Sequence, residues 1–212
     1  MDKPDIQKAL TQLKEQPKRS FVQSYDLVLN LRNLDIKVNP IDFFVALPQS
    51  RGKSVKVCAF VAPELADQAA KYCDFAIREP EFSKYADKKL AKKLATEYDY
   101  FIAQANLMPK IAATFGKALG TKGKMPNPKL GCVVPPNANL EPLVKKLRNT
   151  VRLSAKKGYN LQCLVGKENQ PDEEVIDNII AIYETALKHV PNDKQNIKNI
   201  SLKLTMSPPV KI

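Results

Sequence analysis

The sequence predicts a two-domain protein of mixed α+β and α/β class. One domain is of α+β class and has an antiparallel-type split sheet with helices. A doubly wound, Rossmann-like α/β domain is inserted into it. Residues 53–149 alternate buried strand-like runs with amphipathic helices over short connections, as in a parallel sheet with helices on both faces. Residues 1–52 and 150–212 contain strands whose apolar and polar residues alternate, which indicates sheets with one solvated face. The stretch 48–54 has the composition of a linker.

The flanking segments supply the elements of the α+β domain. Residues 5–15 have the apolar spacing of a short amphipathic helix, and residues 25–32 alternate as in a half-buried strand. Residues 41–47 are a second strand, and we expect the two strands to pair as a hairpin with a long loop. The elements predicted after the insertion are strands over 151–156, 161–167 and 197–206 and a helix over 171–187.

The inserted domain begins with residues 55–61, a nearly continuous apolar run that is typical of a strand buried on both faces. Residues 82–97 are strongly helical and lysine-rich on the outer face, so we expect one surface helix there. The other predicted elements are helices over 64–72, 106–120 and 139–149 and strands over 75–78, 100–103 and 132–134.

The stretch 106–129 has a tightly specified backbone, because four of the chain's seven glycines fall in or beside it. Apolar residues recur at helical spacing from Leu107 to Leu119, and Gly120 is expected to end the helix. Residues 121–128 are predicted to form a loop because they contain Gly123, Pro126 and Pro128. The lysines around this loop are Lys117, Lys122, Lys124 and Lys129.

A glycine-rich basic loop raises the alternative of a nucleotide-binding α/β module or an enzyme. The P-loop pattern requires a glycine, four residues, and then Gly-Lys followed by Ser or Thr. Counting back from Gly123 and Lys124 places Ala118 at the first glycine, and Met125 follows the lysine. The chain also contains no Gly-x-Gly-x-x-Gly sequence. We therefore favour a conformationally fixed loop over a phosphate site.

The net charge of +12 and the isoelectric point near 9.5 indicate a polyanionic partner. Nucleic acid is favoured over a membrane because no stretch of the sequence approaches a transmembrane span. A general solubility charge is the alternative explanation. Residues 1–4 open a polar helix rather than a signal peptide, and we expect a cytoplasmic protein.

The sequence contains no evident catalytic or metal-binding constellation. The four cysteines lie far apart without a Cys-x-x-Cys pair, which argues against a zinc finger and a disulfide framework. Cys58, Cys132 and Cys163 lie in apolar runs and are expected to be buried free thiols. His189 is the single histidine and stands alone near a predicted helix end. We therefore expect a non-enzyme without a cofactor or metal.

The glycine-rich stretch resembles the signature of the L-one family of large-subunit ribosomal proteins, the proteins of the mobile ribosomal stalk. In that family a helix beginning with a Met-Pro-like pair runs into Leu-Gly, a basic residue, a glycine and then Leu/Met-Pro-x-Pro. The matching residues here are Leu107, Met108, Pro109, Leu119, Gly120, Gly123, Lys124, Met125, Pro126, Asn127, Pro128 and Lys129. Thr121-Lys122 replaces the Pro-Arg pair that is common in the family. The resemblance covers nearly the whole chain, and residues 18–24 look archaeal rather than bacterial.

The resemblance implies a structural constituent of the large ribosomal subunit. Such a protein would bind large-subunit ribosomal RNA at the stalk near the exit site and assist release of deacylated tRNA. It would also repress translation by binding its own mRNA, and it would be a monomer off the ribosome. A general single-strand binder is a weaker alternative, because aromatic residues for base stacking are few.

The RNA-binding surface of the family lies on the sheet of the terminal domain. Arg19 and Phe21 match its basic stretch followed by an aromatic residue, although from the residues alone Phe21 fits the core equally well. Thr205 and Met206 match the family's Thr-Met-Gly triplet near the C-terminus, and Ser207 replaces its glycine.

Three further features complete this implied surface. Asp26 matches an acidic residue of the family, and a carboxylate can accept a hydrogen bond from a base amino group or a 2′-hydroxyl. Asn30 shares the non-core face of the same predicted strand, and Gly166 and Lys167 match a Val-Gly-Lys strand end. The full set of implied RNA-binding residues is Arg19, Ser20, Phe21, Asp26, Asn30, Gly166, Lys167, Thr205, Met206 and Ser207.

Overall fold

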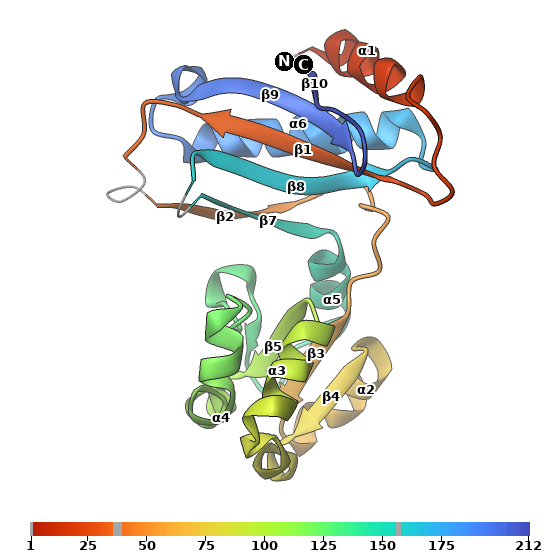
Figure 1. Ribbon diagram of the computed structural model, residues 1–212. Coiled ribbons are helices and arrows are strands. Elements are labelled where there is room, and N and C mark those ends of the chain that lie inside the picture. Colours follow the sequence, from red (N-terminus) through yellow and green to blue (C-terminus); the bar gives the residue numbers. More distant parts are fainter. Residues whose placement is uncertain (1, 36–39, 156–157) are drawn as a thin grey trace. The chain divides into compact units, whose positions relative to one another are not determined.

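The computed structural model describes residues 2–35, 40–155 and 158–212, and its contacts divide the chain into two compact units. The terminal unit runs to Lys53 and resumes at Asn149, and the inserted unit is Ser54–Arg148 (Figure 1). Both units combine helices with strands, one around antiparallel sheets and the other around a parallel sheet. This confirms the predicted fold class.

The terminal unit is built on a four-stranded antiparallel sheet with the strand order β10-β9-β1-β8. Its strands are β1 (Ser24–Leu31), β8 (Asn160–Lys167), β9 (Ile197–Leu204) and β10 (Val210–Lys211). A second, two-stranded antiparallel sheet pairs β2 (Ile41–Ala46) with β7 (Thr150–Ala155). The helices of this unit are α1 (Lys3–Lys14), α6 (Asp172–His189) and the short 3-10 helix η5 (Asp193–Asn196).

β1 and β2 do not form the predicted hairpin. β1 lies between β8 and β9. β2 pairs instead with β7, which follows the inserted unit in the sequence, and Phe43 lies opposite Leu153. Alternation of apolar and polar residues shows which face of a strand is buried, but it does not encode the partner strand. Beyond the paired strands, the N–H of Leu47 donates to the carbonyl of Asn149 at 2.9 Å. The segment shortly before the insertion is therefore hydrogen-bonded to the residue at which the chain re-enters the terminal unit.

The core of the terminal unit lies between one face of the four-stranded sheet and the two long helices. Tyr25, Leu27 and Leu29 point from β1 into this core and are fully buried. The helical residues packed with them include Ile6, Leu10 and Leu13 of α1 and Val175, Ile179 and Ile182 of α6. In Figure 1, α6 lies behind the sheet and α1 beside β10. The opposite face of β1, which carries Asp26 and Asn30, stays half-buried.

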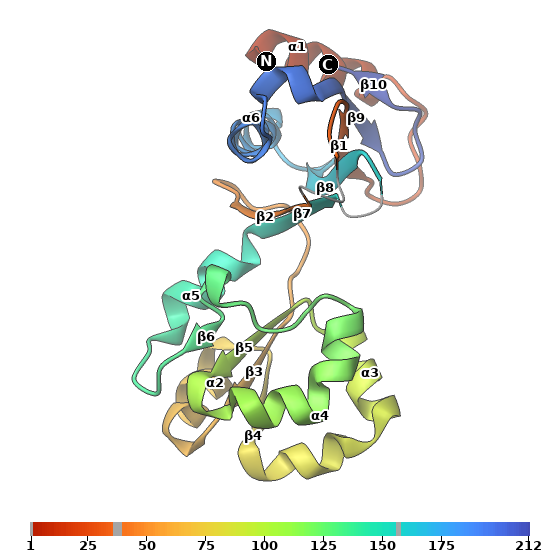
Figure 2. The same cartoon turned by 90° about the vertical axis from the view of Figure 1, so that its left-hand side faces the viewer.

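The inserted unit is a parallel sheet with the strand order β4-β3-β5-β6, in which the first strand is central. The strands are β3 (Val57–Val61), β4 (Phe75–Arg78), β5 (Tyr100–Gln104) and β6 (Val133–Val134). The helices pack as two pairs (Figure 2): α2 (Ala66–Tyr72) with α5 (Leu140–Arg148), and α3 (Lys88–Glu97) with α4 (Met108–Thr121). Short 3-10 helices are η1 (Pro63–Leu65), η2 (Glu79–Ala86), η3 (Ala105–Leu107) and η4 (Pro128–Leu130). Every residue of β3 is buried, as its continuous apolar run predicts.

The single helix predicted over residues 82–97 is wrong, because η2 and α3 are separate helices. The chain between them turns at Asp87, whose backbone is extended, with φ −66° and ψ 118°. The Asp87 carboxylate accepts a hydrogen bond from the N–H of Lys89 at 2.9 Å and so caps α3. An aspartate that caps a helix is indistinguishable, by apolar periodicity alone, from an aspartate on a helix surface.

α4 continues past Gly120 and ends in a Schellman motif around Gly123. Gly123 has φ +64°, and its N–H donates to the carbonyl of Gly120 at 3.0 Å. The N–H of Lys124 donates to the carbonyl of Leu119 at 2.9 Å, which completes the motif. Gly123, not Gly120, therefore terminates the helix, and the predicted loop begins one residue later than residue 121.

Candidate nucleic-acid interface

Three chain segments meet at one end of the four-stranded sheet of the terminal unit. β1 begins at this end, and its antiparallel neighbours β8 and β9 both finish there, with Ser24 opposite Lys167. The N–H of Ser24 donates to Oγ1 of Thr205 at 3.1 Å, across 181 positions of sequence. The sheet thus gathers three of the groups predicted from sequence, which are residues 19–21, 166–167 and 205–207.

Gln23 connects the three segments, and sequence analysis did not identify it. It is only 3% exposed, and its side-chain oxygen accepts the N–H of Met206 at 3.1 Å. Its backbone carbonyl accepts the N–H of Glu168 at 2.9 Å, and its own N–H donates to the Glu168 carboxylate at 3.3 Å. The sequence does contain a signal for Gln23. Gln23 lies two residues before Tyr25 and four before Leu27, so it shares their core-facing side of the strand, yet its side chain is polar.

The turn after β9 is closed by Ser207, the residue that replaces the family glycine. Its hydroxyl oxygen accepts the N–H of Leu204 at 2.8 Å, and its own N–H donates to the Leu204 carbonyl at 3.2 Å. The hydroxyl therefore has a structural partner inside the turn. Met206, between Thr205 and Ser207, projects outward and is 60% exposed.

The loop between α1 and β1 presents Arg19, Ser20 and Phe21 to solvent. Phe21 is 49% exposed, so the alternative that it packs in the core is excluded. The loop faces the start of the β8–α6 connection across an open pocket of about 280 Å³. The residues that line this pocket are Lys18, Arg19, Ser20, Phe21, Val22, Glu168 and Asn169.

Asp26 and Asn30 lie farther along β1, on the sheet face that the two long helices leave open. Asn30 donates from Nδ2 to Oδ1 of Asn199 on β9 at 2.6 Å. Asp26 lies opposite Lys203 of β9 in the strand register. Partial burial raises the pKa of the Asp26 carboxyl, and the positive charge of Lys203 offsets part of that rise.

Gly166 has an internal packing reason to be glycine. A Cβ atom there would lie 2.9 Å from Cγ2 of Val175 on α6 and 3.1 Å from Oε1 of Gln170. The same Gln170 oxygen accepts the N–H of Lys167 at 2.8 Å. Gly166 thus lets α6 approach the end of β8, and its contact with RNA stays a prediction.

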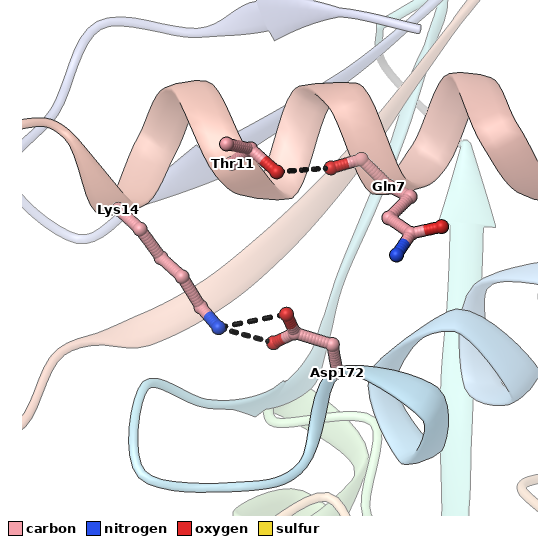
Figure 3. A network of polar contacts seen from close by, with 4 residues as sticks. All are labelled: Gln7, Thr11, Lys14 and Asp172. Carbon is pink, nitrogen blue, oxygen red and sulfur yellow. Dashed lines mark hydrogen bonds and ion pairs between the residues drawn. The ribbon is translucent and has the colours of Figure 1, made fainter.

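An ion pair anchors the helix that leads into the exposed loop. Lys14 Nζ lies 2.6 and 2.7 Å from the two carboxylate oxygens of Asp172, which joins the end of α1 to the start of α6 (Figure 3). Thr11, one turn earlier on α1, donates its hydroxyl to the carbonyl of Gln7 at 2.9 Å. The residues after Lys14 therefore leave α1 from a fixed point.

Tyr25 lies fully buried beneath this end of the sheet. Burial raises the pKa of Tyr25 to about 12, with smaller contributions from the negative charges of Asp172 and Glu168. The Tyr25 hydroxyl has no hydrogen-bond partner within residues 2–35, 40–155 and 158–212. The phenol is therefore neutral at physiological pH.

The family-signature loop lies in the inserted unit and makes contacts within that unit. Its residues include Gly120, Gly123, Lys124, Met125, Pro126 and Pro128. Lys124 Nζ donates to the carbonyl of Tyr98 at 2.7 Å, and Met125 packs against the core. The loop follows helix α4, whereas a P-loop links a strand to the helix after it. This order argues against the nucleotide-binding alternative.

The described residues offer little of the chemistry of an active site. Burial raises the pKa of the Cys73 and Cys132 thiols to about 11, and it raises the pKa of Cys58 and Cys163 as well, so the thiols stay protonated. The His189 ring stacks on the Phe43 ring, with the two ring centroids 4.4 Å apart. In the part of the chain that the structure describes, no group of three acidic, His or Cys side chains is placed to hold a metal. Nor is any helix in that part long and apolar enough to span a membrane.

Comparison with known proteins identifies the family. The family model for the ribosomal protein L1p/L10e family matches residues 13–208. The chain is 39% identical over 203 residues to the large ribosomal subunit protein uL1 of Nanoarchaeum equitans, which covers 94% of this chain and 95% of the relative. It is 40% identical to the protein of the same name from Methanothermococcus thermolithotrophicus, covering 100% of this chain and 99% of the relative. Both relatives are archaeal, which agrees with the archaeal character of residues 18–24 in this chain. The chain therefore belongs to the ribosomal protein L1p/L10e family, which confirms the resemblance in its glycine-rich stretch.

Proposed function

We propose that this protein is a structural constituent of the large ribosomal subunit and that its terminal unit binds ribosomal RNA of the mobile stalk. Its relatives are named as proteins of the large ribosomal subunit, and the family is structural rather than enzymatic. The observation that carries the proposal is the convergence of the β1, β8 and β9 ends. There, Arg19, Phe21 and Met206 are exposed around backbone that Gln23 holds in place.

The chemistry of this surface suits folded RNA. Arg19 supplies charge for phosphate oxygens, and Phe21 supplies an aromatic face. Asp26 and Asn30 on the open sheet face supply groups that can bond to a 2′-hydroxyl or a base edge. The inserted unit adds positive surface charge, since residues 54–148 contain 16 Lys and Arg against 9 Asp and Glu.

Two finer functions and an oligomeric state belong to the same proposal. The protein sits near the exit site of the cytoplasmic ribosome and assists release of deacylated tRNA. It also represses translation by binding its own mRNA, where a similar RNA fold is read by the same residues. Off the ribosome it is a monomer. These functions rest on the family resemblance together with the basic surface of both units.

The test is filter binding to the stalk-region fragment of large-subunit ribosomal RNA, against a scrambled RNA of equal length, over a salt series. We expect tight binding selective for the fragment, and a selectivity that persists at high salt, because shape and 2′-hydroxyl contacts are less screened than phosphate contacts. Equal binding to both RNAs that collapses steeply with salt would leave only a basic surface and overturn the proposal.

Two variants locate the interface in the same assay. Thr205→Ala is expected to weaken binding to the fragment, because Thr205 Oγ1 holds the start of β1 beside the exposed turn. The double variant Lys122→Ala, Lys124→Ala in the inserted unit is expected to weaken it much less. A larger loss of affinity in the lysine variant would indicate that the interface lies on the inserted unit instead.

A further inference from the structure

We propose that the pocket beside Phe21 receives one unpaired guanine of the bound RNA, whose Watson–Crick edge is read by the carboxylate of Glu168. This inference rests on the proposed RNA-binding function and adds a specific nucleotide to it. Glu168 was not among the residues predicted from sequence. It enters the site because the β8–α6 connection faces the α1–β1 loop.

The size and walls of the pocket suit a single base. Its volume of about 280 Å³ is enough for one unstacked nucleobase. Phe21 is half-exposed at its wall, and proteins that read single nucleotides stack them on such aromatic side chains. Asn169, also at the wall, provides an amide that can both donate and accept.

The Glu168 carboxylate is held in place but not saturated. One oxygen accepts the N–H of Gln23 at 3.3 Å, and the backbone N–H of Glu168 is fixed on the Gln23 carbonyl at 2.9 Å. Within the described residues, no hydrogen bond or ion pair occupies the other carboxylate oxygen. An ionised carboxylate only accepts hydrogen bonds, so an RNA partner must present donors.

Guanine is the base that meets this requirement best. Its Watson–Crick edge places two donors, N1–H and the N2 amino group, side by side, and one carboxylate can accept both. Adenine and cytosine offer one amino group next to a ring nitrogen acceptor, which would face the carboxylate unfavourably. Uracil offers one N–H between two carbonyl groups. The acidic side chain therefore selects guanine while it disfavours the other bases.

The rim of the pocket compensates for the negative charge of Glu168. Lys18 and Arg19 are exposed at this rim, and neither forms an ion pair with another described residue. Both cations remain available for the phosphates on either side of the inserted nucleotide. The pocket thus combines a stacking wall, a base-reading carboxylate and two phosphate-binding cations.

Inosine interference mapping tests this proposal. The stalk-region RNA fragment is transcribed with sparse inosine phosphorothioate in place of guanosine, and bound RNA is separated from unbound RNA and cleaved with iodine. Inosine lacks only the N2 amino group, so it removes one of the two donors. With the unaltered protein we expect one guanosine at which inosine weakens binding about tenfold, as for loss of a paired base contact.

Glu168→Gln should abolish that interference, because an amide can no longer accept both guanine donors. Its side-chain oxygen can still accept the N–H of Gln23, which preserves the loop. Glu184→Gln, on the exposed part of α6, makes the same charge change elsewhere and should leave the interference unchanged. Phe21→Ala, at an exposed position, should also reduce it.

The outcomes separate this proposal from the general one. If the fragment binds selectively but no guanosine shows interference, or if the interference persists in Glu168→Gln, the guanine pocket is wrong and the RNA-binding function stands. If the unaltered protein binds the fragment no better than a scrambled RNA, the RNA-binding function itself is overturned.

Discussion

Gln23 determines the geometry of the candidate interface through one buried side chain and its own backbone. A buried amide is costly without hydrogen-bond partners, and here each partner belongs to a different segment of the interface. Met206 lies in the turn after β9, and Glu168 lies in the connection after β8. The exposed loop that carries Arg19 and Phe21 runs directly into Gln23. The site is therefore positioned by a residue that does not itself face solvent.

Replacing Gln23 with alanine should reduce both stability and RNA binding. The variant leaves the part-buried N–H of Met206 without its partner, so we expect the free energy of unfolding to fall by about 1–3 kcal/mol. Urea denaturation followed by circular dichroism measures this change, and filter binding measures the affinity for the stalk RNA fragment. Gln12→Ala, at an exposed position of α1, is the control and should change stability by less than about 0.5 kcal/mol. Unchanged RNA affinity in Gln23→Ala would show that other contacts hold the loops.

Tyr25 makes the stability of the terminal unit sensitive to alkaline pH. Its pKa is raised to about 12 in the folded protein, mainly by burial, whereas an unfolded chain has the ordinary value near 10. The folded state thus favours the neutral phenol. This stabilising contribution is complete below about pH 10 and is lost as the pH rises through about 12, by an amount on the order of 2 kcal/mol.

The comparison that isolates this effect uses Tyr25→Phe. Unfolding curves collected between about pH 9 and pH 12 should show a smaller loss of stability for the variant than for the unaltered protein, because other titrating groups are common to both. Parallel pH profiles for the two proteins would show that the pKa of Tyr25 does not differ between the folded and unfolded states.

At the scale of elements, α4 shows how two nearby glycines have opposite roles. Gly123 has φ +64° at the helix end, a conformation that costs a residue with a Cβ about 1–2 kcal/mol. Gly120 lies within the helix, and a Cβ there would meet no neighbouring atom within 4 Å. Its flexibility therefore only weakens the helix.

Alanine substitutions at the two positions should have opposite signs. Gly123→Ala should lower the free energy of unfolding of the inserted unit by about 1–2 kcal/mol, and Gly120→Ala should raise it by about 0.5–1 kcal/mol. Chemical denaturation of the full chain measures both against the unaltered protein. Destabilisation by Gly120→Ala would mean that the glycine is needed for a close approach that the isolated chain does not show.

Much of the element structure follows from local sequence, but its assembly does not. The continuous apolar run of β3 and the alternation in β1 correctly predict how deeply each strand is buried. The pairing of β2 with β7 depends on contacts across the whole insertion, which no local pattern contains. The same limit applies to the interface. Phe21 and Thr205 are predicted through the family resemblance, whereas the contribution of Glu168 becomes visible only once the ends of β1 and β8 are side by side.

At the scale of the whole molecule, the terminal unit consists of two chain segments joined through another unit. The N–H of Leu47, shortly before the insertion, bonds to the carbonyl of Asn149, where the chain returns, so the segments on either side of the insertion are adjacent. An insertion between adjacent points places no geometric demand on the terminal unit. The terminal unit should therefore keep the proposed RNA-binding surface without the inserted unit.

Replacing Ser54–Arg148 by a short glycine–serine linker tests this independence. The shortened protein should still prefer the stalk RNA fragment over a scrambled RNA. Its affinity should be lower at low salt, because 16 basic and 9 acidic residues are removed, a net loss of +7. Filter binding over a salt series measures both quantities. Loss of selectivity with the fold intact, as judged by circular dichroism, would show that the inserted unit also reads the RNA.

The hydrogen bond between Ser24 and Thr205 has a consequence for synthesis of the chain. Every residue of the inserted unit is translated before β7, so that unit has its full sequence while half of the terminal unit is still missing. β1 emerges early but lacks both of its neighbours until β8 and β9 are made. Thr205 directly follows β9, so the three-segment end of the sheet cannot form until β9 and the turn after it have been made. We therefore expect a chain that stops before Thr205 to lack the candidate interface and to compete poorly with longer chains for the proposed RNA partner.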